Sequence, residues 1–190
     1  MKLVLATRNP GKRREFARLL EPHEVVLLPD DVDLPPETGD TFAANAIPKA
    51  RAAASATGIA AIADDSGIEA AALNGAPGVR SARFAGENAT DQENLDKLRA
   101  QAPPGSGLEY VCALAFVDPT TDAEHLVEGR CAGTMATEPT GTGGFGYDPV
   151  FLPADRDDGR TMAELTDGEK DAISHRGRAA RALLAWLPTD

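Results

Sequence analysis

The stretch LVLATRNPGKRREFARLL, residues 3–20, decides the fold class, because it joins a strand, a tight turn and a helix. Lys2 to Ala6 is an apolar run with the length of a short buried strand. The turn-forming sequence Thr7-Arg8-Asn9-Pro10-Gly11 follows, and residues 12–20 repeat apolar side chains at helical spacing. A strand that passes directly into a helix is typical of α/β proteins.

The rest of the chain continues this alternation and later contains a hairpin. In the first half we expect a strand over Val25–Leu28 and a proline-rich loop over residues 29–40. A helix should follow from the N-cap Thr41 to about Thr57, with a bend at Pro48. The next strand, over Ile59–Ala63, should end abruptly at Asp64-Asp65-Ser66-Gly67. In the second half we expect a helix from the capping box Thr90–Glu93 to about Ala100, a hairpin of Leu108–Val117 and His125–Ala132, a capping box Thr166–Glu169, and a last helix from near Ser174. This order predicts an α/β fold with a mixed sheet, forming one domain over residues 1–190 whose sheet can carry two lobes.

Composition narrows the function classes. The formal net charge of −11 argues against a nucleic-acid platform, since a phosphate backbone rewards a net basic surface. A small polyanion stays possible if basic side chains gather locally. Cys112 and Cys131 have no metal-type spacing, and we expect neither to form a disulfide. The chain opens directly into a strand pattern and has no long apolar run, so a cytoplasmic protein without membrane contact is expected.

The turn after the first strand is a candidate anion site. A helix N-terminus presents unpaired backbone N–H groups, and its dipole favours an anion. Lys12, Arg13 and Arg14 are unfavourable for the helix itself in its first turn, which a bound anion would explain. The spacing is not that of a P-loop. A solvated basic face explains this segment equally well.

Asp64 and Asp65 are candidate metal ligands, because ligands in α/β folds bind beyond the carboxyl ends of strands. Carboxylate oxygens beside a triphosphate are the usual ligands of Mg²⁺, and one of the pair could orient a water. The alternative is an Asx-turn that caps the strand exit. Glu37 is of interest only if it meets Asp65, since a lone loop glutamate is usually solvated.

Two later segments carry candidate base-binding residues. In the glycine-rich loop at residues 143–149, Phe145 and Tyr147 could stack on a planar base and Asp148 could accept from ring N–H groups. Packing of both aromatics into the core is the better interpretation of aromatics in general. Lys170 with Ser174-His175-Arg176 offers donors for a carbonyl or phosphate oxygen, although such clusters are more often solvated.

Five segments occur in order between Leu3 and Ala179: LVLATRNPGKRREF, ETGDTFAANAIPKA, IADDSGIEAAALNGAPGVRSARFAG, GTGGFGYDPVF and AELTDGEKDAISHRGRA. Together they resemble the non-standard purine NTP pyrophosphatase family, also called inosine triphosphate pyrophosphatases. The resemblance implies an elongated α/β fold with a central mixed sheet flanked by helices, two lobes with the active-site cleft between them, and a homodimer. It also implies Mg²⁺-dependent hydrolysis of ITP, dITP and XTP to a nucleoside monophosphate and pyrophosphate.

The same resemblance implies roles for individual residues. Glu37 and Asp65 would hold Mg²⁺, with Asp65 also the general base and Asp64 beside it. The substrate would be bound by residues of three segments: Thr7, Arg8, Asn9, Pro10, Gly11 and Lys12 at the triphosphate, Ser66 after the acidic pair, and Phe145, Gly146, Tyr147, Asp148, Lys170, His175 and Arg176 at the base.

Two positions depart from the family pattern. Arg8 stands where many members have glycine, which predicts an added phosphate contact or a narrowed turn. Ala44 stands where members usually carry an acid, three residues after Thr41, so the usual glutamate would complete a capping box. A weaker helix start is the plainer consequence of Ala44, and loss of a carboxylate near the metal is the sharper one.

Two alternatives to this enzyme remain. One is a pyrophosphatase for modified pyrimidine nucleotides, against which the segments SHR and GFGYD argue. The other is a nucleotide-binding homologue impaired by Ala44. For a purine enzyme, donors such as Lys170 and Arg176 facing the 6-carbonyl would reject adenine, because a buried donor would be left facing its amino group.

Overall fold

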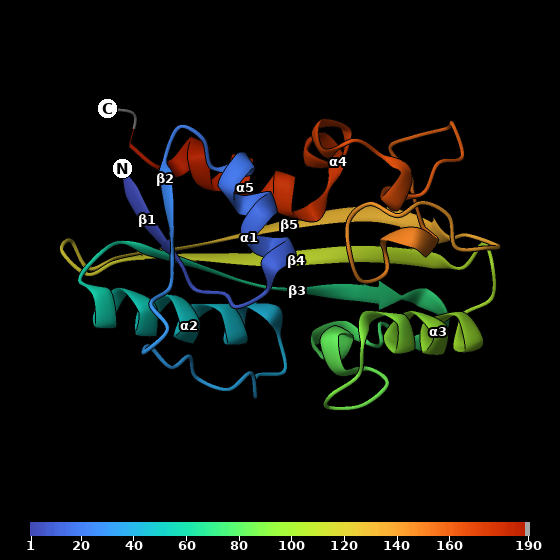
Figure 1. Ribbon diagram of the computed structural model, residues 1–190, viewed down its shortest axis with the longest axis horizontal. Helices are drawn as coiled ribbons and strands as arrows, with labels where there is room; N and C mark the ends of the chain where they lie inside the picture. Colours follow the sequence, from blue (N-terminus) through green and yellow to red (C-terminus); the bar gives the residue numbers. More distant parts are fainter. Residues whose placement is uncertain (189–190) are drawn as a thin grey trace. The chain divides into compact units, whose positions relative to one another are not determined.

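The computed structural model describes residues 1–188 (Figure 1). Its strands are β1 (Lys2–Leu5), β2 (Glu24–Leu27), β3 (Ala61–Ala70), β4 (Gly107–Asp118), β5 (Ala123–Met135) and β6 (Phe151–Pro153). Its α-helices are α1 (Pro10–Leu19), α2 (Phe42–Thr57), α3 (Asp91–Gln101), α4 (Asp167–Ile173) and α5 (His175–Trp186). Short 3-10 helices lie at η1 (Ala71–Leu73), η2 (Gly78–Arg83), η3 (Asp148–Val150) and η4 (Met162–Glu164).

The strands form a six-stranded sheet in the order β2-β1-β3-β4-β5-β6. β1 pairs in parallel with β2 and β3, with Leu5 opposite Leu27 on one side and Ile62 on the other. β5 and β6 are antiparallel. The expected mixed sheet and α/β class are therefore confirmed.

The chain divides into two compact units. Unit 1 comprises Met1–Asp65, Cys112–Gly129 and Arg176–Asp190, and unit 2 comprises Ser66–Val111 and Arg130–His175. The strands β3, β4 and β5 contribute residues to both units. The single domain over residues 1–190 and the cleft implied by the resemblance stay predictions, and residues 189–190 lie outside the described part of the chain.

In unit 1, helices cover both faces of the strands. Figure 1 shows α1 and α5 on one side of β1 and β3, and α2 on the other side. The α1 and α5 side is filled by large side chains such as Phe16, Ile62 and Leu183. The α2 side is lined by small ones, because the buried positions of that helix are mostly alanines. Small side chains allow a helix to approach a sheet closely, so the two faces differ in the size of residue they accept.

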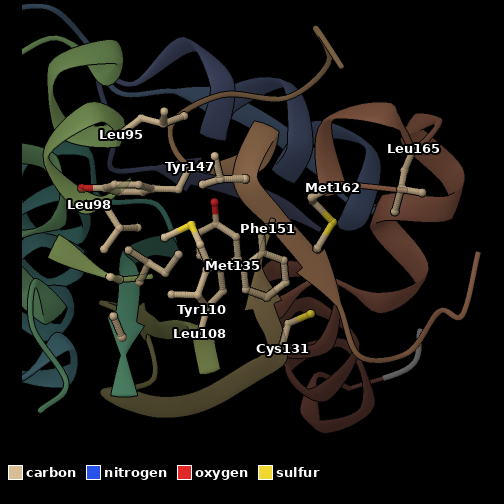
Figure 2. Close-up of a cluster of buried hydrophobic side chains, with 14 residues drawn as sticks. Leu95, Leu98, Leu108, Tyr110, Cys131, Met135, Tyr147, Phe151, Met162 and Leu165 are labelled. Carbon is tan, nitrogen blue, oxygen red and sulfur yellow. The ribbon is translucent and has the colours of Figure 1, made fainter. Parts of the chain in front are cut away.

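Unit 2 has its own hydrophobic core, shown in Figure 2. Leu95 and Leu98 of α3 and Tyr110 of β4 belong to it, with Met135 and Phe151 from the strands that follow. The rings of Tyr110 and Phe151 lie 4.6 Å apart between centroids, tilted by 39°. This packing holds the ring of Tyr110 in the core, so its hydroxyl has a defined position toward Asp148.

Local signals in the sequence are mostly confirmed. Thr90 and Thr166 are the N-caps of α3 and α4, each with a complete capping box, and α5 begins at His175. Pro48 lies inside α2, and Cys112 and Cys131 are both buried. A further capping box at Thr161 and the short β6 were not predicted. Among residues 1–188, no helix is both long and apolar enough to cross a membrane.

One strand boundary was wrong. β3 does not end at Ala63 but continues through Asp64 and Asp65 to Ala70. It lies between β1 and β4 in the sheet, so its backbone has pairing partners that the local sequence does not reveal. The two aspartates therefore lie inside a strand, although beyond the last residue of the shorter β1.

Candidate active site

The turn after β1 is closed by Asn9, the N-cap of α1. Its side-chain oxygen accepts hydrogen bonds from the backbone N–H groups of Gly11 at 2.8 Å and Lys12 at 3.1 Å. Thr7, at the preceding bend, accepts from the N–H of Asn9. The expectation that this helix start offers unpaired N–H groups is therefore wrong for these two, because an Asx-type cap satisfies them. The cationic side chains carry the positive charge of the turn.

Asp64 and Asp65 point to opposite faces of β3, since successive side chains of a strand alternate. On the α1 and α5 face, a carboxylate oxygen of Asp64 lies 2.9 Å from Lys12 Nζ and 3.6 Å from Arg176 Nε. On the α2 face, Asn45 Nδ2 donates to a carboxylate oxygen of Asp65 at 2.8 Å. The neighbouring acids thus belong to different environments.

Asp64 is fully buried and organises cations. Burial alone would raise its pKa, but the charges of Lys12, Arg176 and Lys49 outweigh burial and hold the pKa well below its ordinary value. Arg176 also pairs with Glu15, whose carboxylate oxygen lies 3.0 Å from its Nη1. The environment of Asp64 therefore favours its charged form, which pairs with Lys12 and Arg176.

The negative charge of Asp65 is less well compensated by neighbouring cations than that of Asp64. Burial raises the pKa of Asp65, and the nearby charge of Glu37 raises it further, against the lowering effects of Lys49 and Asn45. Glu37 is brought there by Lys49, whose Nζ donates to Glu37 Oε1 at 2.6 Å and to the backbone carbonyl of Asp64 at 2.7 Å. Glu37 is therefore held beside the backbone of Asp64, where its charge acts on Asp65.

The loop that carries Glu37 is tied to α2 by Asn45. The side-chain oxygen of Asn45 accepts from the N–H of Gly39 at 2.7 Å, while its amide group reaches Asp65. Asn45 and Lys49 are one helical turn apart, so both point from α2 toward β3. A single helix face therefore positions both carboxylates, Glu37 and Asp65.

In unit 2, Asp148 is the centre of a buried polar group. Its carboxylate accepts from Lys170 Nζ at 2.6 Å, from the Tyr110 hydroxyl at 3.1 Å and from the backbone N–H of Phe145 at 2.9 Å. Gly144 has φ +68°, and a Cβ there would collide with the Asp148 carboxylate and come within 3.0 Å of Lys170 Nζ. Asp148 thus shapes the glycine-rich loop and holds Lys170.

The aromatic residues of the loop divide between the two interpretations. Tyr147 is buried in the core of unit 2 and its hydroxyl donates to the carbonyl of Ser81 at 2.7 Å. Phe145 is half-buried, with Lys170 Nζ 5.2 Å from its ring centroid. His175 is buried and stacks on Tyr110, with 4.6 Å between centroids and 7° between planes. Tyr147 therefore has a packing role, and Phe145 keeps part of its ring exposed.

The sequence-predicted residues thus gather into two sets. Unit 1 brings together Lys12, Asp64 and Arg176 on one face and Glu37 and Asp65 on the other. Unit 2 brings Phe145, Asp148 and Lys170 together, with His175 joined to them through Tyr110. Arg176, expected with the base-binding residues, makes its ion pairs in unit 1. Ser66 and Gly146 are half-buried, and Gly146 donates its backbone N–H to Asp91.

Comparison with known proteins shows to which family the chain belongs. The sequence pattern of the Ham1 family matches residues 3–186. The chain belongs to the Ham1 family. It is 49% identical to the dITP/XTP pyrophosphatase of Streptomyces coelicolor, over 96% of this chain and 95% of that protein. It is also 49% identical to the dITP/XTP pyrophosphatase of Escherichia coli K12, over 98% of both chains. The solved structure of a HAM1 protein from Coxiella burnetii superposes with a TM-score of 0.84 at 43% identity, covering 98% of both chains.

Four residues of this Ham1 family member were missed from the sequence: Glu15, Asn45, Lys49 and Tyr110. Asn45 and Lys49 carried a usable signal, since they are polar residues one turn apart on a helix whose other buried positions are mostly alanine. Glu15 and Tyr110 carried none, because their partners Arg176 and Asp148 are distant along the chain. Only the fold brings such pairs together.

The donor set of this Ham1 protein fits Mg²⁺ only together with a phosphate ligand. Among residues 1–188, no three histidine, cysteine or acidic side chains form a ready cage for a metal ion. Mg²⁺ in nucleotide enzymes is usually held by one or two carboxylates, several waters and the substrate phosphates. Glu37 and Asp65, which are held by Lys49 and Asn45, would supply this smaller set.

Proposed function

We propose that this Ham1 family member hydrolyses deaminated purine nucleoside triphosphates, ITP, dITP and XTP, to the nucleoside monophosphate and pyrophosphate. The observation that carries the proposal is the pair Glu37 and Asp65, held on one face of β3 by Lys49 and Asn45. The names of the relatives in S. coelicolor and E. coli, which are 49% identical to this chain, support the same activity. The activity removes damaged nucleotides from the pool before they enter nucleic acid.

The triphosphate would be bound by the cations of unit 1. Lys12 is held by Asp64 at the start of α1, and its side chain is only 14% exposed. Because Asp64 stays charged, it keeps Lys12 and Arg176 oriented in the absence of substrate. Preoriented cations lower the cost of binding a polyanion, since less side-chain freedom is lost at that moment.

The reaction adds one water across the α–β phosphoanhydride. Mg²⁺, which Glu37 and Asp65 would hold, neutralises phosphate charge when it is bound. Asp65 accepts the proton of the attacking water, the water oxygen bonds to phosphorus, and the pyrophosphate oxygen leaves with the bonding electrons. Asn45 fixes the orientation of the Asp65 carboxylate by its hydrogen bond of 2.8 Å. Glu37 adds a second oxygen ligand rather than a second base.

The base would be read in unit 2. Phe145, which is half-buried, would stack on the base, and Lys170, fixed by Asp148, is the proposed donor to the 6-carbonyl of a deaminated purine. Adenine presents an amino group at that position, so a buried donor would face another donor and lose its hydrogen bond. A site built to hydrogen-bond one group rejects an analogue without it by large factors.

Ala44 does not favour an impaired nucleotide-binding homologue. It is exposed in the first turn of α2, where its backbone N–H still donates to the Thr41 hydroxyl at 3.1 Å. The helix begins at the expected residue, and Asn45 and Lys49 reach their partners. Ala44 lacks only the side-chain carboxylate that, in a capping box, accepts a hydrogen bond from the backbone N–H of the N-cap residue, here Thr41.

A product assay tests the proposal. The protein with Mg²⁺ is given ITP, XTP, ATP, GTP or CTP, and nucleotides, pyrophosphate and orthophosphate are separated. Monophosphate and pyrophosphate from ITP and XTP, with little from the others, are expected. Orthophosphate as the first product, or equal turnover of ATP, would refute it.

The resemblance also supports a homodimer in the cytoplasm, which light scattering in solution and fractionation of cells would test.

A further inference from the structure

Arg8 makes an unusual set of contacts for a residue in a predicted phosphate turn. Its guanidinium donates to four backbone carbonyls of the following loop: Leu28 at 3.0 Å, Pro29 at 2.8 Å, Asp30 at 3.4 Å and Val32 at 3.0 Å. It also pairs with the Asp30 carboxylate at 3.2 Å. Five donors in a planar fork make arginine suited to such a fan of acceptors, and a lysine ammonium cannot reproduce it.

The anchored loop is the one that carries Glu37. Four residues separate Val32 from Glu37, and two of them, Pro35 and Pro36, have fixed φ angles. On the far side of Glu37, Gly39 is bound by Asn45. The segment is thus fixed at two points, by Arg8 before Glu37 and by Asn45 after it, so the position of Glu37 depends on both.

We propose that Arg8 is a positioning residue, which orders the loop of residues 28–37 and thereby sets Glu37 beside Asp65, rather than a phosphate ligand. Its backbone acceptors all lie in that loop, and its place directly after Thr7 links the turn of α1 to the second carboxylate of the site. The proposal rests on the role given to Glu37 in the proposed function.

Three variants separate positioning from phosphate binding. Arg8→Lys keeps the positive charge but loses the fan of hydrogen bonds, whereas Arg8→Gly loses both. Asp30→Asn is the matched control, because the Asp30 side chain is fully exposed and contributes only a surface ion pair. A phosphate contact predicts that Arg8→Lys resembles the wild type, and positioning predicts that it resembles Arg8→Gly.

The first readout is hydrogen–deuterium exchange of the protein without metal or nucleotide. Peptides covering residues 28–40 should exchange faster in Arg8→Lys and Arg8→Gly, by about fivefold, the factor that follows from losing one net hydrogen bond of about 1 kcal/mol. Asp30→Asn should leave exchange unchanged. Unchanged exchange in α3 (Asp91–Gln101) shows that the variants remain folded. This result does not depend on any activity, so it stands even if ITP is not the substrate.

The second readout is the Mg²⁺ concentration for half-maximal turnover of ITP. It should rise in both Arg8 variants more than the KM for ITP does. In a Glu37→Gln background the Arg8 variants should add nothing further, since the loop then has no carboxylate to position. Wild-type exchange and Mg²⁺ dependence in Arg8→Lys would overturn the proposal, as would a full additive effect in the Glu37→Gln background. Absence of ITP turnover in the wild type would instead refute the proposed function.

Discussion

The ammonium of Lys49 lies 2.6 Å from a carboxylate oxygen of Glu37, and the same nitrogen reaches the backbone carbonyl of Asp64 at 2.7 Å. This buried lysine joins the loop that carries Glu37 to β3 at Asp64, the neighbour of Asp65. Its side chain is only 7% exposed, so this connection accounts for a buried charge at that place.

Replacing Lys49 by Met should release Glu37. Turnover should fall by about 10- to 100-fold, the usual cost of losing a partner that orients a metal ligand, and the Mg²⁺ requirement should rise. Steady-state kinetics over a Mg²⁺ series measures both. Arg51→Gln on the same helix is the control, since Arg51 is exposed and pairs with Glu124. Equal effects of the two changes would contradict the role of Lys49.

Replacing Asp65 by Asn should remove the proposed base while keeping the shape of the site. Single-turnover hydrolysis of ITP should fall by about 100-fold or more, within the range expected for a general base. Binding of ITP, followed by calorimetry in Ca²⁺ or Mg²⁺, should weaken far less. Normal turnover in this variant would exclude Asp65 as the base.

Replacing Asp64 by Asn should act on stability first. Lys12 and Arg176 would lose the buried charge that neutralises them, and breaking a buried pair from one side costs about 3–5 kcal/mol. Urea unfolding compared with Asp65→Asn measures the difference. If both variants lost the same free energy of unfolding, the separation of the two aspartates onto different faces would be in doubt.

Replacing Tyr110 by Phe should disturb base recognition from a distance. The change leaves the ring that stacks on His175 but removes the donor to Asp148, at a cost of about 1–3 kcal/mol for an unsatisfied buried acceptor. The ratio of kcat/KM for ITP over ATP should decrease. Tyr147→Phe, which loses a hydrogen bond to the Ser81 carbonyl, tests whether any lost hydroxyl in this core has the same effect.

Replacing Ala44 by Glu should complete the capping box at Thr41, as found at Thr90, Thr161 and Thr166. The free energy of unfolding should increase by about 0.5–1 kcal/mol. Turnover of ITP should stay within about twofold, an energy change of less than 0.5 kcal/mol in the barrier. A large gain in turnover would mean instead that Ala44 removes a carboxylate the reaction needs.

What the sequence predicted well was local. The capping boxes at Thr90 and Thr166 are satisfied within four residues, so their effect is visible in the sequence and is confirmed by the starts of α3 and α4. The strands near the N-terminus and the hairpin strands were also predicted, because short apolar runs bounded by turn signals are typical of buried strands.

What it missed was long-range. The end of β3 was placed at Ala63 because two charged residues follow, yet Lys12 and Arg176 neutralise Asp64 from helices far along the chain. The resemblance placed Arg8 at the triphosphate, and no local pattern in the sequence indicates its hydrogen bonds to residues 28–32. No local pattern distinguishes these partners from solvent.

The two residues that precede Asp64 and Asp65 fix the register of β3. Ile62 lies on the side of Asp64, among large side chains, and Ala63 lies on the side of Asp65, against the alanines of α2. A slip of one residue would turn Asp64 and Asp65 each to the opposite face of β3 and would take Asp64 away from Lys12 and Arg176. It would also force isoleucine into a space shaped for alanine. The difference of three carbon atoms between the side chains of Ile62 and Ala63 thus determines which face of β3 each aspartate occupies. Exchanging them, by Ile62→Ala with Ala63→Ile, would favour the wrong register.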